Sequence, residues 1–154
     1  MPIFLKIDSI EGDTTMTGHA GEIEASAVAY GIARPSGTDM TAKAASGPPS
    51  ITEVAVTKVQ DHASLPLTTA LITGRSVGTV TITFAEADKD RLVDYLTIEM
   101  EDTRVSSVHT SSDGDRPTEQ VSFSSPQVRW TDLTAEPKPS SFGYDFASNQ
   151  TLSL

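Results

Sequence analysis

The chain contains no cysteine among its 154 residues, so disulfide bonds and thiolate metal sites are excluded. Basic residues are also few, because 11 Lys and Arg face 21 Asp and Glu, and the formal net charge is −10. Binding to nucleic acid depends on Lys and Arg that neutralise phosphates, and here the basic residues are scattered singly. We therefore expect neither a nucleic-acid partner nor an anionic membrane partner.

Long apolar runs are missing as well. No stretch approaches the ~20 apolar residues that a membrane-spanning helix needs, so we expect no membrane insertion. Residues 1–8 lack the basic and apolar pattern of a secretory signal. We expect a protein that starts in the cytoplasm and needs dedicated machinery if it is exported. The length of the chain favours a single domain over residues 1–154.

Apolar residues that alternate with polar ones are the main pattern that is present. The clearest runs lie at residues 77–84 and 92–100, and similar runs occur at 3–7, 22–32, 51–59, 104–109, 118–123 and 127–130. A period of two marks strands with one face toward a core, and short polar breaks between strands are typical of antiparallel meanders. The sequence therefore predicts a mainly β, antiparallel fold.

The alternation changes phase once, at residues 124–126. Val121 and Phe123 occupy odd positions, whereas Val128 and Trp130 occupy even ones. A slip of one residue turns every later side chain to the other face, and a bulge or bend at Pro126 would absorb it, because proline cannot donate to the ladder. A sheet bent at this point indicates a closed or rolled antiparallel β-barrel.

The predicted strand at residues 22–32 has small side chains at its odd positions. They are Ala25, Ala27, Ala29 and Gly31. This small face would let another chain or element approach closely, or it would be a thin part of the core. The sequence leaves both interpretations open.

One short helix is predicted after residue 63. Ser64 is placed to cap it, Pro66 is tolerated in the first turn, Leu67 belongs to its apolar stripe, and Gly74 ends it. The helix would have two to three turns and is marginal alone, so packing must hold it. We expect it to flank the barrel across one open end.

The long extended loop is predicted at residues 34–50. It has no periodicity and contains many breakers, and loops of this length in compact domains are commonly functional or disordered. We expect an arm that orders against a partner, with the candidate contact residues Arg34, Pro35, Ser36, Gly37, Thr38, Asp39, Gly47, Pro48 and Pro49. The tail at residues 148–154 is expected to fray.

No constellation of side chains demands an enzyme. His19, His62 and His109 do not have the spacing of a metal site, and Ser106 and Ser107 lack a Gly-x-Ser-x-Gly elbow. The paired carboxylates lie mostly in charged turns, where solvated charge is the common explanation. We expect no catalytic activity, no metal and no cofactor.

The order and spacing of several short motifs resemble the Hcp family, the tube proteins of the bacterial type VI secretion system. Each motif is weak alone, but together they cover nearly the whole chain. A departure is Gly74-Arg75, where the family often has Gly-Lys. The residues that carry the resemblance are His19, Glu22, Ile23, Gly31, Lys58, Asp61, Gly74, Tyr95, Ser106, Ser107, Arg116, Thr118, Glu119, Trp130 and Tyr144.

The resemblance implies a β-barrel with one flanking helix that assembles with itself into hexameric rings. Rings of the family stack into a hollow tube inside a contractile sheath, with a spike protein at its tip. The resemblance implies effector proteins as cargo in the lumen, and a subunit that is cytoplasmic before firing and secreted afterwards. The arm at residues 34–50 would then stabilise ring stacking.

Two other functions remain open from the sequence. One is the tube of a related contractile tail or injection particle. The other is a small β-barrel binding module or polysaccharide-active enzyme, for which His109, Asp113 and Asp115 are the best candidates. Oligomeric mass distinguishes the second alternative from a tube subunit.

Overall fold

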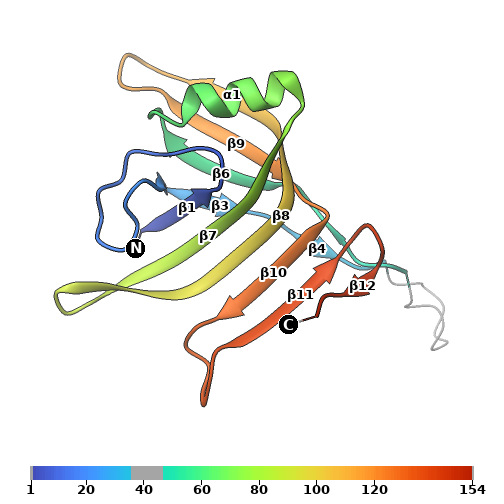
Figure 1. Ribbon diagram of the computed structural model, residues 1–154. Coiled ribbons are helices and arrows are strands. Elements are labelled where there is room, and N and C mark those ends of the chain that lie inside the picture. The colour runs from blue at the N-terminus through green and yellow to red at the C-terminus, as the bar shows by residue number, and fades with distance from the viewer. Residues whose placement is uncertain (1, 36–46, 154) are drawn as a thin grey trace.

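The computed structural model describes residues 2–35 and 47–153, which form one α-helix and twelve β-strands (Figure 1). The prediction of a mainly β fold with a single helix is confirmed for this part of the chain. The elements are β1 (Ile3–Ile7), β2 (Ile23–Ala25), β3 (Ala27–Ala29), β4 (Ile32–Ala33), β5 (Ser50–Ile51), β6 (Val54–Val59), α1 (Ser64–Thr73), β7 (Ser76–Asp88), β8 (Arg91–Ser111), β9 (Thr118–Ser124), β10 (Gln127–Asp132), β11 (Ser140–Asp145) and β12 (Gln150–Thr151).

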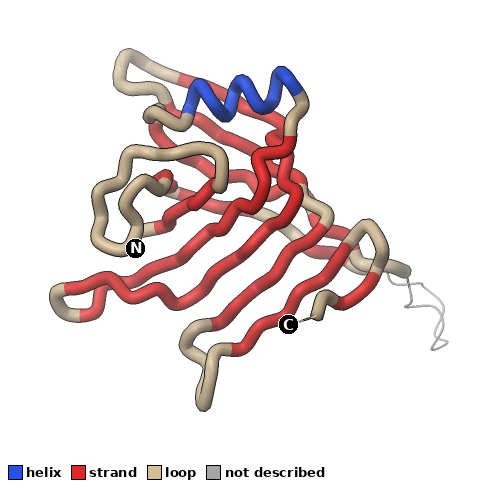
Figure 2. The backbone as a smooth tube through the Cα atoms, viewed as in Figure 1, coloured by secondary structure: helices blue, strands red, loops and turns tan. Residues whose placement is uncertain are grey.

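The sheet is built around the long strand β8. The sequence predicted two strands here, at 92–100 and 104–109, but the structure has one strand of 21 residues. The break that the pattern indicated is only a local irregularity, where Asp102 has a φ of 49° and Thr103 is buried. β7 pairs along one edge of β8, while β9 and β10 share the other edge (Figure 2).

The predicted phase change at Pro126 is the point where the sheet divides. β9 ends at Ser124 and β10 begins at Gln127. The hydroxyl of Ser125 donates to the carbonyl of Glu101 on β8, which holds the break against the long strand. On one side β9 pairs with β6, and on the other β10 pairs with β11. The bend inferred from the alternation is confirmed.

The predicted strand at residues 22–32 is wrong in extent, because it is divided into β2, β3 and β4. β2 pairs with β1, β3 pairs with β6, and Ser26 lies between them. The pairing therefore follows an open, branched path, and the predicted closed barrel is not confirmed. Of the small residues in this stretch, Ala25 is buried, whereas Ala27 and Ala29 are exposed.

The helix α1 lies across the upper end of the sheet in Figure 1. Leu67 and Ala70 are buried, and Gly74 ends the helix in the left-handed region with a φ of 72°. Its N–H donates to the carbonyls of Ala70 and Leu71, as glycine after a helix commonly does. The prediction of Ser64 as the cap was wrong by one residue. Ala63 occupies the N-cap, and Ser64 is the first helical residue.

The core lies between the inner faces of these strands and the helix. Phe4 is buried too, although it alternates with Leu5 and Ile7 in β1, because His19 from the following connection stacks on its ring with centroids 4.1 Å apart. The buried apolar side chains of the main cluster come from both halves of the chain and include Leu5, Ile7, Ile23, Val54, Val56, Leu67, Val80, Ile82, Ile98, Met100, Val121, Phe123 and Val128.

The C-terminal segment, predicted to fray from residue 148, is hydrogen-bonded to β11 up to residue 152. β12 pairs with β11 through Tyr144 with Thr151 and Asp145 with Gln150. The N–H of Leu152 also donates to the carbonyl of Gly143 at 2.9 Å. A glycine at position 143 leaves room for this return, because a Cβ there would lie 3.1 Å from the Leu152 side chain.

Candidate functional site

The serine and histidine side chains on β8 do not form a catalytic group. A bulge between Val105 and Ser107 shifts the alternation, so Val105 is buried and does not continue a common face with Ser107 and His109. The hydroxyl of Ser106 donates to the carbonyl of Ser122 at 3.1 Å. His109 is exposed. Ser106 therefore stabilises the pairing of β8 with β9.

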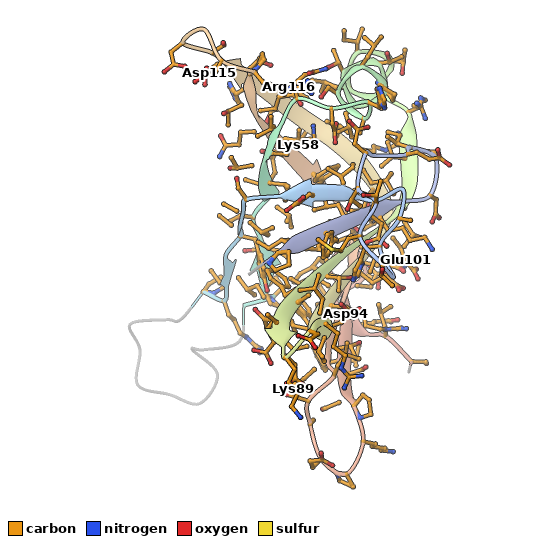
Figure 3. All side chains as sticks on the ribbon, turned by 90° about the vertical axis from the view of Figure 1, so that its left-hand side faces the viewer. Lys58, Lys89, Asp94, Glu101, Asp115 and Arg116 are labelled. Carbon is orange, nitrogen blue, oxygen red and sulfur yellow. The ribbon has the colours of Figure 1, made fainter. Side chains whose placement is uncertain are left out.

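The carboxylates Asp113 and Asp115 are exposed in the turn between β8 and β9. Figure 3 shows Asp115 at the outer end of this turn. Across the described ranges, 2–35 and 47–153, no group of three His, Asp or Glu side chains could hold a metal ion. No helix within the same ranges is long and apolar enough to cross a membrane.

A buried ion cluster joins β6, α1 and β9. Lys58 is only 1% exposed, and its Nζ lies 2.8 Å from Asp61 Oδ1 and 2.8 Å from Glu119 Oε1. Nζ also donates to Ser64 Oγ at 3.1 Å, and that hydroxyl donates to Glu119 Oε1 at 2.6 Å. A buried charge is tolerated when it is paired and hydrogen-bonded in this way. Figure 3 shows Lys58 in the interior, below the helix.

The local sequence explains how these four side chains meet. β6 turns Val54, Val56 and Lys58 to the same buried face, and Lys58 is the direct partner of Glu119 in the β6–β9 ladder. The chain then turns at Asp61, whose Oδ1 accepts the N–H of Ala63 at 3.0 Å. The cluster therefore fixes the start of α1 against the sheet. The motif positions Lys58, Asp61 and Glu119 carry this structural role.

A second polar cluster surrounds His19, which is 6% exposed. Its Nδ1 lies 3.0 Å from Glu22 Oε1, and its Nε2 lies 2.9 Å from Asp94 Oδ1. Burial by itself would lower the pKa of His19, but the hydrogen bonds and charges of Glu22 and Asp94 outweigh it and raise the pKa above its ordinary value. The His19 ring ties the connection before β2 to β8. Sequence reasoning found the pair of His19 and Glu22 but missed Asp94, which is 75 residues away.

The predicted arm, residues 34–50, is connected to the fold through two short paired strands. Ile32 pairs with Ile51 and Ala33 with Ser50, so β4 and β5 form a two-stranded ribbon. Next to this ribbon, Gly47 lies against Pro35, since a Cβ on Gly47 would be 2.9 Å from Pro35 Cγ. Arg34 and Pro48 are exposed. Of the predicted contact residues, Ser36, Gly37, Thr38 and Asp39 lie outside the described residues.

The other motif positions are spread over the fold and do not converge on one site. Tyr95 packs near Phe84, with ring centroids 6.3 Å apart. Arg116 donates to the carbonyl of Gln60 at 3.2 Å. The remaining positions have separate local roles: Ile23 is buried in the core, Gly31 is hydrogen-bonded to Thr52, Thr118 begins β9, and Tyr144 packs edge-on against Phe146.

One contact between distant segments was not predicted. The indole N–H of Trp130 on β10 donates to the hydroxyl of Tyr30, after β3, at 2.9 Å. The centroids of the two rings are 6.5 Å apart. Nothing in the sequence indicated this pair beyond the presence of two aromatic side chains in predicted strands.

Comparison with known proteins identifies the family of this fold. The sequence profile described as "Type VI secretion system effector, Hcp" matches residues 4–131. No curated protein sequence gives a significant match.

Solved structures share the fold. A type VI secretion system effector from Yersinia pestis is 24% identical, covers 93% of this chain and 98% of its own, and has a TM-score of 0.77. Hcp1 from Salmonella typhimurium is also 24% identical, with 98% of both chains covered and a TM-score of 0.82. A protein described as a type six secretion system protein is 22% identical, covers 98% of this chain and 99% of its own, and has a TM-score of 0.88. The profile match over most of the sequence shows that the chain belongs to the Hcp family of type VI secretion system effectors.

Proposed function

We propose that this protein is a structural tube subunit of a bacterial type VI secretion system. The observation that carries the proposal is the family match over residues 4–131. The clusters at Lys58 and His19 support it, because each joins separate segments of the fold and uses its polar groups internally. The role is structural, and the predicted enzymatic alternative gains no support from His109, Asp113 or Asp115, which are exposed.

The subunits form hexameric rings through contacts between two different surfaces of the chain. A closed ring uses heterologous contacts, so one surface of a protomer must fit another surface of its neighbour. The formal charge of −10 on each copy opposes this association, although exposed charges more than ~8 Å apart are screened at physiological ionic strength. The ring is therefore held by uncharged surface.

We also propose that the strands around the core close into a barrel at Ser26. β2 and β3 are separated only by this residue, whose N–H donates to the carbonyl of Thr57 on β6 at 2.8 Å. Between β2 and β3, a continuous series of paired strands runs through β1, β7, β8, β9 and β6, which supports this part of the proposal. We include this closure in the proposal because a closed barrel removes exposed edges from the body of the subunit.

The arm at residues 34–50 contacts the next ring in the stack. Its base, the β4–β5 ribbon, supports this role because it extends away from the body of the sheet in Figure 1. The candidate contact residues are those predicted from the sequence. The contractile sheath, the spike at the tube tip and effector proteins in the lumen are the further partners, and the subunit is cytoplasmic before firing and secreted with the tube.

Negative-stain electron microscopy of the purified protein tests this function. We expect annular particles, with stacks of rings at high protein concentration. Purified protein that shows no annular particles at any concentration would contradict the proposal and favour a monomeric binding module.

A further inference from the structure

We propose that a groove between β2 and the end of β6, the seam groove, binds an extended, basic segment of another protein as an added β-strand. The groove has a volume of about 680 Å³, and ligand pockets commonly enclose roughly 300–1,000 Å³. It is lined by Glu24, Ala25 and Ser26 at β2 and by Val59, Gln60 and Asp61 at the end of β6. Binding there does not require assembly into a tube.

The edge of β6 that faces the groove is paired only as far as Thr57. β3 pairs with this edge up to Ala27 and Thr57, and the described strands β2 and β6 form no ladder with each other. On the opposite edge, Gln60 donates its N–H to the carbonyl of Pro117, next to β9, at 2.9 Å. Neighbouring residues of an antiparallel strand direct their backbone groups to opposite edges, so the N–H and C=O of Val59 point away from β9, into the gap.

β2 directs backbone groups into the same gap. The N–H of Ser26 donates across it to the carbonyl of Thr57 at 2.8 Å. Glu24 lies two residues before Ser26, and its N–H and C=O therefore lie on the same edge of the strand. The two strands diverge beyond the Ser26 contact, so backbone groups border the groove on both sides. Unpaired edges of this kind are the usual template for the addition of a strand.

The walls of the seam groove are held by contacts within the chain. Asp13, from the connection between β1 and β2, also lines the groove, and its Oδ1 accepts the N–H of His62 at 3.3 Å and lies 2.7 Å from His62 Nδ1. Arg116, another lining residue, donates to the carbonyl of Gln60 at 3.2 Å and lies above the N-terminal strands in Figure 3. A preformed site loses less conformational entropy when a ligand binds.

The side chains around the groove indicate the chemistry of the segment that fits it. Met16 and Val59 line the groove and are 42% and 50% exposed, so they offer apolar area for burial. The exposed carboxylates of Asp13 and Glu24 line it as well, whereas the guanidinium of Arg116 is already bonded to a carbonyl. Successive side chains of a strand point to opposite faces, so a segment of alternating apolar and basic residues fits both features.

The charge of the whole chain favours a different protein over a second copy as the occupant. Each copy carries a formal charge of −10, and two copies therefore repel each other. The same charge attracts a basic segment and raises its rate of association. The occupant is thus a strand of a partner protein that carries Lys or Arg.

The probe for this site is a fluorescent, end-capped heptapeptide of alternating valine and lysine, titrated with the full chain and followed by fluorescence anisotropy. Saturable binding is expected, and Glu24→Lys should weaken it about fivefold or more, because a like charge then faces the lysines. The matched control is Glu53→Lys, which changes the net charge equally at an exposed position outside the groove. It should bind within about twofold of wild type. The corresponding valine–glutamate peptide is expected to prefer Glu24→Lys over wild type.

Hydrogen exchange measured by mass spectrometry tests the pairing with the backbone. Saturating valine–lysine peptide is expected to slow exchange several-fold in residues 22–26 and 57–61 and to leave residues 104–109 on β8 unchanged. The proposal is overturned by the absence of saturable binding, by equal weakening in folded Glu24→Lys and Glu53→Lys, or by unchanged exchange in residues 57–61. Protection of residues 57–61 in concentrated protein without peptide would identify a second copy as the occupant and overturn it too. Light scattering of the same samples reports ring assembly separately.

Discussion

His19 is held between two carboxylates, and this makes part of the stability dependent on pH. Glu22 and Asp94 accept from its two ring nitrogens, and Phe4 stacks on its face. The geometry favours the doubly protonated ring, because each nitrogen then donates to a carboxylate. The raised pKa of His19 is therefore a contribution to the stability of the folded state.

The sign of the pH effect follows from the raised pKa. The stabilisation is fully present below the ordinary histidine pKa of about 6.5 and is lost as the pH rises through the raised folded-state pKa. We expect the melting temperature to fall over this interval in wild-type protein and to fall less in His19→Gln. Thermal melts of both proteins at a series of pH values measure the difference. Parallel pH profiles would contradict the assignment.

Lys58 carries the largest predicted single-residue effect on stability. Lys58→Met leaves the buried carboxylate of Glu119 and the half-buried carboxylate of Asp61 without their cation, and breaking a buried pair in this way costs about 3–5 kcal/mol of unfolding free energy. Lys138→Met is the control, because Lys138 is exposed and its loss should change stability by less than about 0.5 kcal/mol. Chemical denaturation measures both. Equal stabilities would show that the cluster does not hold α1 to the sheet.

The end of α1 depends on a glycine for its backbone conformation. Gly74 has a φ of 72°, and no atom lies within 4 Å of the position of an added Cβ. Gly74→Ala should therefore cost about 1–2 kcal/mol from backbone strain alone, without a steric clash. Ile72→Ala, in the exposed last turn, is expected to be nearly neutral. A Gly74→Ala protein as stable as wild type in urea unfolding would argue against the left-handed cap.

The arm is expected to act in stacking and not in ring formation. Deletion of residues 37–47 removes most of it, while the β4–β5 ribbon at its base is retained. We expect the deletion protein to form single rings but no long stacks in electron micrographs. Long tubes from the deletion protein would exclude the arm as the stacking contact, and loss of rings would assign it to contacts within the ring.

The period of two correctly predicted a mainly β fold, and Gly74 correctly predicted the end of α1. Both features are encoded by residues close together in the sequence. The alternation also located the division of the sheet at Pro126. It failed for β8, where Asp102 and Thr103 interrupt the pattern without ending the strand. It failed again around Ser26, where one long apolar stretch changes pairing partner from β1 to β6. Such exchanges depend on which strands meet in space.

The polar clusters were predictable only in part for the same reason. Lys58 alternates with Val54 and Val56, so its position on the buried face was readable from the sequence. Its partner Glu119 is 61 residues away, and Asp94 is 75 residues from His19. The pair of Tyr30 and Trp130 is separated by 100 residues. Contacts across such distances require the topology of the sheet, which the alternation alone did not supply.

The complete chain combines a strongly acidic composition with several exposed apolar side chains, among them Ile32 and Phe142. The formal charge of −10 favours separation of the copies, while burial of exposed apolar area would favour association. A tube subunit needs both properties, because rings must assemble firmly through defined contacts and must not aggregate through others. The Hcp family membership of the chain agrees with this balance.

Size-exclusion chromatography with multi-angle light scattering tests the central claim most directly. At physiological ionic strength and high protein concentration, we expect a single species with six times the mass of the chain. High salt should not dissociate it, because apolar association does not weaken with screening. A mass that equals one chain at every concentration and salt condition would contradict the account.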